Sequence, residues 1–422
     1  RHGARAQCNG DFCWSGDHEG NFTCSLNYLE NSVDGQSGPL TPFFRTVYLR
    51  GRNTLPGNCL LGQLVDAGFE MERANGRRLR EAYVDREGLL PKSLDGEALE
   101  DFYFRSTEVP RTKQSGMALV SGLYADMPPK EPFITLQTMD MAEENMLVNP
   151  VVCPAVGEAG TAFFAGLPSQ RSAELVGLCS QLNPAVAKDA KTCFWWLQHL
   201  VDCLMSRTCP TVPFHPRNAT VPGHFLADDA ALMRRVWRVV DEVQFEFFGR
   251  MRDAGAFGPL VSEILAASEA AVAGGPARKF LLYSGHDTGP MEPLYATFGL
   301  RAAAPFWPSF ASMLVLELWE APGGPIARWI SNGEVVSGPV PYADFRAQAS
   351  AVAGSGARCG AGAPPPALAP RMPWISSEGF AMAALAGSLT VALVMGLWAR
   401  TGMAMALRGP RSPSIRAHCA PP

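Results

Sequence analysis

The first five residues, Arg1-His2-Gly3-Ala4-Arg5, place guanidinium groups on both sides of an imidazole. Arginine binds phosphate oxygens through a planar fork of N–H donors and keeps its charge at every physiological pH. A histidine ring can act as a nucleophile, and a glycine lets the backbone approach a ligand closely. This stretch therefore indicates an anion pocket with a nucleophile inside it, although so short a pattern also arises by chance.

Two further stretches carry side chains of the same kind. RSTEVPRT supplies Arg105 and Arg111 together with neutral hydroxyl donors, and LLYSGHDT places His286 and Asp287 directly after an apolar run. In open α/β sheets, ligands bind at the edge where the strands have their carboxyl ends. Each stretch alone could be a surface arginine or a loop histidine, but three of them in this order favour one phosphate site.

Hydrophobic patterns predict the strands and helices that must hold these side chains in place. Strands are expected at 102–104, 279–284 and 312–319, and a hairpin at 327–336 around Asn332-Gly333. Amphipathic helices are expected at 59–84 and 228–249, the second capped by Asp228 or Asp229 and ended by Gly249. Strands near both ends with helices between them predict an α/β domain into which a helical region is inserted.

The segment from Gly379 to Trp398 carries no charge and is as long as the hydrocarbon core of a bilayer is thick. A buried core helix is the alternative, but the flanking sequences favour a membrane span. A Pro/Ala-rich tether precedes it, and arginines without any acidic residue follow it, namely Arg400, Arg408, Arg411 and Arg416. By the positive-inside rule, the C-terminus is then cytoplasmic and everything before Gly379 is lumenal or extracellular.

Cysteine usage agrees with that placement. Ten of the eleven cysteines precede the apolar segment, an even number that an oxidising compartment favours. None forms a Cys-x-x-Cys pair, so a structural zinc site is not expected. Asn21 and Asn218 begin N-glycosylation sequons. Because no signal peptide is visible, we expect the natural protein to carry a signal peptide and a strand before Arg1.

Length and charge bound the organisation of the chain. It has 422 residues and a formal net charge of −4, and this mild acidity without a basic stripe argues against a nucleic-acid partner. The length allows two domains, or one large domain with appendages. We assign residues 1–130 and 256–348 to the α/β core, 131–255 to a helical cap insertion, 349–378 to the tether, 379–398 to the transmembrane helix and 399–422 to a cytoplasmic tail.

Taken in order, these stretches resemble the histidine acid phosphatase family, in the branch that contains acid phosphatases and phytases. The opening resembles the family's R-H-G-x-R-x-P, RSTEVPRT its R-S-T-x-x-x-R-T, SGHDT its S-x-H-D-T, and GQLVDAG its G-Q-L-T-x-x-G. The likeness runs from Arg1 to about residue 345 and is weakest across 130–255. Asn75-Gly76 and RTKQSGMAL are most similar to the 2-phosphoxylose phosphatase members. The resemblance implies a phosphoglycerate-mutase-like core, with a mixed central sheet flanked by helices, and an inserted helical cap.

The resemblance also implies a role for each site residue. His2 attacks phosphorus and becomes a phosphohistidine, while Asp287 protonates the leaving oxygen. The phosphate is held by a ring of four side chains, namely Arg1, Arg5, Arg111 and His286. No metal or other cofactor is implied, because the arginines supply the positive charge. The implied substrate is a small phosphomonoester such as a phosphorylated sugar or glycan, the implied pH optimum is acidic, and the oligomeric state stays open.

The sequence departs from the family pattern at Gln7, where proline is usual, at Ala4, where aspartate is common, and after Thr288. Two alternatives stay open. One is an inactive phosphatase-like ectodomain that binds a ligand or partner, and the other is a member of the cytosolic phosphoglycerate-mutase branch, which shares R-H-G. The complete set of site residues disfavours the first alternative. The apolar segment, the cysteines and the His-Asp pair disfavour the second.

Overall fold

The computed structural model describes residues 1–8, 22–24, 30–31, 44–45, 59–94, 99–125, 134–208, 220–221, 224–225, 230–275, 277–300 and 307–359. The apolar segment 379–398, the asparagines of both sequons and the two aspartates expected to cap a helix lie outside these residues. Among the helices that are described, none combines the length and the apolar character that a membrane crossing needs.

Two three-stranded sheets form the centre of the molecule. Parallel strands make the first, in the order β4 (Leu136–Gln137), β3 (Phe102–Ser106) and β7 (Phe280–Ser284). Antiparallel strands make the second, in the order β10 (Glu334–Pro341), β9 (Ile326–Ser331) and β8 (Leu314–Trp319). The strands predicted from apolar runs are thereby confirmed.

The hairpin predicted around Asn332-Gly333 is also confirmed. Asn332 has φ 50° and Gly333 has φ 84°, the left-handed conformations that these two residue types adopt most readily. The turn joins β9 to β10, and Ser331 pairs with Glu334 directly beside it. Along β9, buried residues such as Trp329 alternate with half-buried ones, as expected for a strand with one face on the core.

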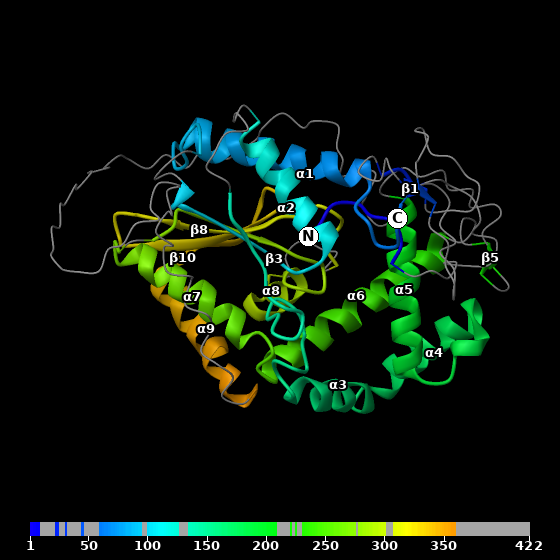
Figure 1. Cartoon of the computed structure of the whole chain (residues 1–422). Coiled ribbons are helices and arrows are strands. Elements are labelled where there is room, and N and C mark those ends of the chain that lie inside the picture. The colour runs from blue at the N-terminus through cyan, green and yellow to red at the C-terminus, as the bar shows by residue number, and fades with distance from the viewer. Residues whose placement is uncertain are drawn as a thin grey trace, which may run out of the picture.

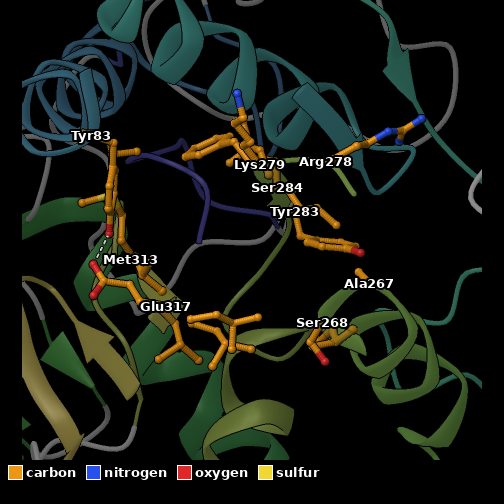
Figure 2. A pocket seen from close by; sticks show the side chains of 18 of the residues that line it. Tyr83, Ala267, Ser268, Arg278, Lys279, Tyr283, Ser284, Met313 and Glu317 are labelled. Carbon is orange, nitrogen blue, oxygen red and sulfur yellow. Dashed lines mark hydrogen bonds between the residues drawn. The ribbon is translucent and has the colours of Figure 1, made fainter. Parts of the chain in front are cut away.

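A cavity of about 710 Å³ separates β7 from β8. Instead of the one mixed sheet that the resemblance implies, the described strands therefore form two sheets, because β7 and β8 lie on opposite walls of this β7–β8 cavity (Figure 2). Tyr283 of β7 and Met313, directly before β8, both line it. Across one end, the Tyr83 hydroxyl donates to Glu317 Oε1 at 2.5 Å.

Two helix pairs cover the strands on opposite sides (Figure 1). α1 (Asp66–Leu79) and α2 (Pro110–Leu123) form one pair, and α7 (Gly258–Val272) and α9 (Tyr342–Ser355) form the other. A short π-helix, η2 (Arg80–Arg86), continues α1. The α1 and α2 backbones approach closely at Gly76 and Gly122, where an added Cβ would collide with a backbone carbonyl of the other helix.

Further helices gather at one end of the molecule (Figure 1). They are α3 (Ala155–Ala165), α4 (Ser169–Leu182), α5 (Ala190–Thr208) and α6 (Ala230–Asp253), and α8 (Met291–Phe298) contacts α6 from the core side. Leu175, Leu197 and Val236 are fully buried in their common core. Shorter elements are β1 (Glu30–Asn31), β2 (Phe44–Arg45), β5 (Thr220–Val221), β6 (His224–Phe225), η4 (Pro184–Val186) and η6 (Gly356–Cys359).

The end of α6 differs from the prediction. The helix passes through Gly249 and continues to Asp253, where the sequence predicts an end at Gly249. Nothing lies within 4 Å of a Cβ built on Gly249, so the glycine imposes no turn there. Met251 is fully buried in the core, and its burial favours one more helical turn. The chain turns at Gly255 instead, which has φ 95°.

The packed part of the chain extends past residue 348, where the sequence predicts the tether to begin. α9 runs to Ser355 and packs against α7, and its residue Ala349 is fully buried. Cys359 forms a disulfide with Cys153. A second disulfide joins Cys24 to Cys59. Residues 136–137, inside the range assigned to the cap insertion, pair with β3. The remaining domain boundaries stay predictions.

Candidate active site

The segment from Arg1 to Gln7 is buried and is held by backbone hydrogen bonds. The Val65 amide donates to the Ala4 carbonyl at 3.1 Å, and the His2 amide donates to the Gly285 carbonyl at 2.9 Å. Gly3 lies so close to Gly68 at the start of α1 that a Cβ on either residue would collide with the other segment's backbone. Because both residues are glycines, α1 can pack directly against the segment Arg1–Gln7, here called the His2 loop, and so determine its position.

The other predicted site residues come from the two central parallel strands. Arg111 lies in the first turn of α2, which follows β3, and His286 and Asp287 follow β7. Because β3 and β7 are parallel neighbours, their carboxyl ends lie at the same sheet edge. His2 is linked to this edge through Gly285, so the three sequence stretches meet at one place.

His2 carries its ring proton on Nδ1, because Nδ1 lies 2.9 Å from the Gly3 carbonyl oxygen, which can only accept. That bond leaves Nε2 unprotonated in the neutral ring. Burial lowers the pKa of His2 well below its usual value, and the positive charges of Arg111, Arg1 and Arg5 add to the effect, as does His286. The structure therefore favours a neutral imidazole that keeps a lone pair on Nε2 in acidic solution.

The three predicted phosphate-binding arginines surround His2. The guanidinium groups of Arg1 and Arg5 lie 4.1 Å and 5.6 Å from the centroid of the Phe310 ring, which itself lies 5.6 Å from the His2 ring. Arg5 makes a two-pronged ion pair with Asp202 of α5, at 2.7 Å and 2.9 Å. Burial alone lowers the pKa of Arg5, but Asp202, together with Cys8 and Asp287, outweighs burial and raises the pKa above the usual value.

His286 lies next to His2, with ring centroids 5.4 Å apart. Arg111 Nη2 donates to His286 Nδ1 at 3.2 Å, because a guanidinium has only donors. The ring proton of neutral His286 is therefore on Nε2, 3.1 Å from the Thr107 hydroxyl oxygen. Burial, together with Arg111, lowers the pKa of His286 to about 3. In this structure, its one ring proton is directed to Thr107.

Two hydrogen bonds and one ion pair hold the Asp287 carboxylate. Oδ2 accepts from the Trp307 indole Nε1 at 2.6 Å and lies 2.8 Å from Arg1 Nη2. Oδ1 accepts from the Thr288 amide at 2.9 Å. Burial alone raises the pKa of Asp287, but Arg1, the Trp307 N–H, Arg5 and the Thr288 amide together outweigh burial and lower the pKa to about 2.

All six predicted site residues thus lie in one cluster, in which Arg111 is half-buried and the other five are buried. Their catalytic roles stay a prediction. Arg105, which the sequence suggests as a second arginine of the phosphate site, is engaged elsewhere. It bonds to carboxylates of Glu144 and Glu263 at 2.7 Å each. Since Arg105 is 1% exposed and paired with two acids, it stabilises the packing of β3 against its neighbours instead.

Three residues of the cluster carry no signal in the sequence motifs, namely Asp202, Trp307 and Phe310. They lie outside the recognised stretches and reach the cluster only through the packing of α5 and of the segment before β8. Gln7, which stands where the family has proline, is 1% exposed, and its Oε1 lies 3.5 Å from Arg207 Nη2. Over the described residues, no set of His, Cys, Asp and Glu side chains is arranged to bind a metal ion.

Comparison with known families places the chain among phosphatases. Residues 1–190 match the model of the histidine phosphatase superfamily, branch 2. Counting factor 60 from Dictyostelium discoideum is 30% identical over 310 residues, which cover 71% of this chain and 70% of that protein. The chain belongs to the histidine phosphatase superfamily, branch 2, and the family resemblance seen in the sequence is confirmed.

Other curated relatives are more distant. A probable acid phosphatase from Schizosaccharomyces pombe is 28% identical over 285 residues, covering 64% of this chain and 57% of that protein. Human 2-phosphoxylose phosphatase 1 is 25% identical over 285 residues, covering 65% of this chain and 55% of that protein. The chain thus spans little more than half the length of these two relatives.

Solved structures of phytases share the fold. Hafnia alvei phytase in complex with tartrate matches with a TM-score of 0.52 at 16% identity, covering 83% of this chain and 95% of that one. Citrobacter braakii phytase matches with a TM-score of 0.52 at 14% identity, covering 86% of this chain and 98% of that one. At this identity the likeness concerns the fold alone, which is an α/β histidine phosphatase-like fold.

Proposed function

We propose that this chain hydrolyses phosphomonoesters through a phosphohistidine on His2, with Asp287 as the proton donor. The observation that carries the proposal is the state of the His2 ring. Its Nδ1–H is bonded to the Gly3 carbonyl, so that Nε2 has a lone pair, and three arginines lie close enough to affect its pKa. A neutral nucleophile inside a cluster of cations is suited to attack on a phosphate, which is an anion.

The first step forms the phosphoenzyme. The Nε2 lone pair of His2 attacks phosphorus, the bond between phosphorus and the ester oxygen breaks, and that oxygen takes a proton from Asp287. Arg1, Arg5, Arg111 and His286 are the proposed phosphate ligands. The N–H donors of the three arginines stabilise the negative charge on the non-bridging oxygens as it shifts in the transition state.

The second step restores the enzyme. Asp287, now a carboxylate, accepts a proton from a water molecule whose oxygen attacks phosphorus. The P–N bond breaks, its electron pair returns to Nε2, and inorganic phosphate leaves. A carboxyl with a low pKa suits this second role, because it remains ready to accept a proton over a wide pH range.

Trapping the intermediate tests the proposal. Enzyme mixed with ³²P-labelled substrate is quenched in alkali, in which phosphohistidine survives better than in acid, and the labelled peptide is mapped. The label is expected on His2 and is expected to be absent from His2→Ala. His199→Ala, which changes a histidine of α5 outside the cluster, is the matched control. A label on serine or aspartate, or full activity of His2→Ala, contradicts the proposal.

The proposed substrates are small phosphomonoesters, including phosphorylated sugars and glycans. Relatives are named for reactions of this kind, such as 2-phosphoxylose phosphatase 1 and lysophosphatidic acid phosphatase type 6. A phosphate-release screen that includes sugar phosphates, lysophosphatidic acid and a generic aryl phosphate would rank these classes.

We also propose that the catalytic part lies in the lumen or outside the cell, anchored by the segment 379–398. The disulfides Cys24–Cys59 and Cys153–Cys359 support an oxidising compartment. Protease protection of a C-terminal tag in sealed vesicles tests the orientation, and a tag on the lumenal side contradicts it.

A second candidate function is a binding module without turnover. One observation favours it: the relative with 30% identity is named a counting factor rather than an enzyme. Phosphate release that depends on His2 would exclude this candidate. Ligand binding without any release by the wild-type chain would support it.

A further inference from the structure

Trp307, a residue outside the three sequence motifs, holds the Asp287 carboxylate by a hydrogen bond. Its indole N–H donates to Oδ2 at 2.6 Å, which is shorter than the 2.9 Å bond from the Thr288 amide to Oδ1. Trp307 lies between α8 and β8, outside all three motifs. The bond is buried, since Trp307 is 3% exposed and Asp287 is 8% exposed.

Trp307 is itself held firmly by α6. Its backbone amide donates to Asp241 Oδ1 at 2.6 Å, and its ring lies 6.3 Å from that of Trp237. Asp241 and Trp237 are both on α6. The indole therefore has little freedom to rotate away, and the orientation of the Asp287 carboxylate is tied to α6.

The two oxygens of the Asp287 carboxylate differ in their surroundings. Oδ2 accepts the Trp307 N–H and forms an ion pair with Arg1 Nη2 at 2.8 Å, whereas Oδ1 accepts only the Thr288 amide. A proton on Oδ2 would cost the Trp307 hydrogen bond and would lie against the positive guanidinium of Arg1. When Asp287 is protonated, the proton is therefore favoured on Oδ1.

We propose that Trp307 is a positioning residue that holds Asp287 Oδ2 and so directs the transferable proton to Oδ1. The inference rests on the proposed function, in which Asp287 gives a proton to the leaving oxygen. The role is specific to the N–H group, because the rest of the indole packs as any large aromatic ring would. Other charged groups act on the same carboxylate. The groups that interact electrostatically with Asp287 are Arg1, Arg5, Arg111, His286 and Glu292 of α8.

Removing the N–H has two expected effects. The Asp287 carboxylate loses a donor, so its pKa rises and the alkaline limb of the pH–activity profile moves up by about one unit, the size expected for one hydrogen bond to a charged group. The carboxyl also loses its fixed orientation. We therefore expect kcat to fall by about tenfold for an alkyl phosphate, which needs a proton donor, with KM little changed.

The experiment compares Trp307→Phe with Trp329→Phe in the full chain. Trp329→Phe removes a buried indole of β9 that lies outside the site cluster, and it is expected to keep the wild-type profile. Glycerol phosphate and p-nitrophenyl phosphate are the two substrates. The upward shift of the alkaline limb and a larger loss on glycerol phosphate, seen in Trp307→Phe alone, support the inference.

A second variant separates loss of the N–H group from loss of folding. Replacing Trp307 with 3-benzothienylalanine exchanges the indole N–H for a sulfur atom of similar shape. If Trp307→Phe unfolds, this replacement supplies the result. A wild-type pH profile in the folded variant overturns the inference, while activity of the wild type still supports the proposed function. Absence of phosphate release by the wild type, or full activity of His2→Ala, overturns the proposed function itself.

Discussion

At the scale of single residues, the surroundings in the cluster give His2 and Asp287 different protonation states, which suit a nucleophile and a proton donor. His2 and Asp287 both have lowered pKa values, but the lowered pKa favours the neutral form of His2 and the charged form of Asp287. Burial and neighbouring arginines disfavour a positive imidazole, whereas the same arginines, with Trp307, favour a negative carboxylate. The nucleophile is thus ready at acidic pH, while the proton donor is filled only in acid.

Activity is therefore expected to fall as pH rises above about 2, the pKa of Asp287, and to keep falling through neutrality. Asp287 must be protonated for the first step, and above its pKa the protonated fraction falls tenfold for each pH unit. Asp287→Ala should reduce activity on glycerol phosphate most and spare p-nitrophenyl phosphate, whose leaving oxygen needs little help. The pH–rate profiles of both substrates are the measurement. Equal losses on both substrates would remove Asp287 from the role of acid.

The burial of Glu292 should make the free energy of unfolding depend on pH. Burial raises its pKa well above the usual value, with Asp287 adding to the effect, and its Oε2 accepts from Gln244 Nε2 at 2.5 Å. An acid with a raised folded-state pKa contributes stability that is complete below its unfolded pKa of about 4.5 and is lost as pH rises toward the folded pKa.

Glu292→Gln should abolish that loss, because the amide is neutral at every pH and retains an acceptor for Gln244. Urea unfolding at pH 4.5 and pH 7.5 gives the comparison. The wild type should lose more free energy of unfolding between the two pH values than the variant. Equal losses in the two proteins would show that Glu292 is not neutral in the folded state.

At the scale of elements, one close contact between α1 and the His2 loop positions the nucleophile. Gly68→Ala would drive a methyl group into the Ala4 backbone. We expect a loss of about 1–3 kcal/mol in the free energy of unfolding and a fall in kcat of tenfold or more, since the displaced segment carries His2. Thermal unfolding and steady-state kinetics measure both.

Gly177→Ala on α4 is the control for this substitution. No atom lies within 4 Å of a Cβ at that position, so alanine should stabilise the helix by up to about 1 kcal/mol and leave kcat unchanged. A Gly68→Ala variant that behaves like this control would show that the backbone contact does not constrain the loop.

The sequence predicts those elements whose signals are local. β7 follows from its apolar run, and the β9–β10 hairpin follows from Asn332-Gly333, because the strand period and the left-handed turn are properties of a few adjacent residues. The meeting of Arg111 with His286 also follows, since it requires only that β3 and β7 be parallel neighbours.

Contacts that depend on packing between distant elements are not predicted. The Trp307 bond to Asp287 requires α6 to hold the segment before β8, and no motif encodes that arrangement. Arg105 reads as a phosphate ligand because only its type and spacing are visible in the sequence. Glu144 and Glu263, which neutralise it, lie on other elements. The end of α6 was likewise decided by the burial of Met251 rather than by the local glycine.

At the scale of the whole molecule, the β7–β8 cavity is expected to accept one more extended strand. The Arg1 backbone nitrogen donates to the Ser312 carbonyl at 2.7 Å, and the His2 amide donates to the Gly285 carbonyl, so the chain enters this cavity at one end. Residues added before Arg1 would run parallel to β7. Apolar side chains of α2 and α7 line the cavity, so both faces of such a strand should be apolar.

Fusion of an apolar β-branched segment of about six residues before Arg1 should therefore raise the melting temperature and the phosphatase activity. Each buried backbone group that gains a partner is worth about 1–3 kcal/mol, against a total stability of only about 5–15 kcal/mol. A Gly/Ser segment of equal length is the control. Cooperative melting and turnover that are the same with and without the apolar segment would refute the expectation.

The Cys153–Cys359 disulfide changes how this molecule would respond to a protease. It closes a covalent ring across 206 residues, and His286 and Asp287 lie inside that ring while His2 and Arg111 lie before it. A single cut between 154 and 285 would divide the nucleophile and the proton donor between two polypeptides. Those polypeptides would still migrate as one species until a reductant separated them. A nicked molecule would thus keep its mass and its site cluster, and the cut would be detected only on a reducing gel.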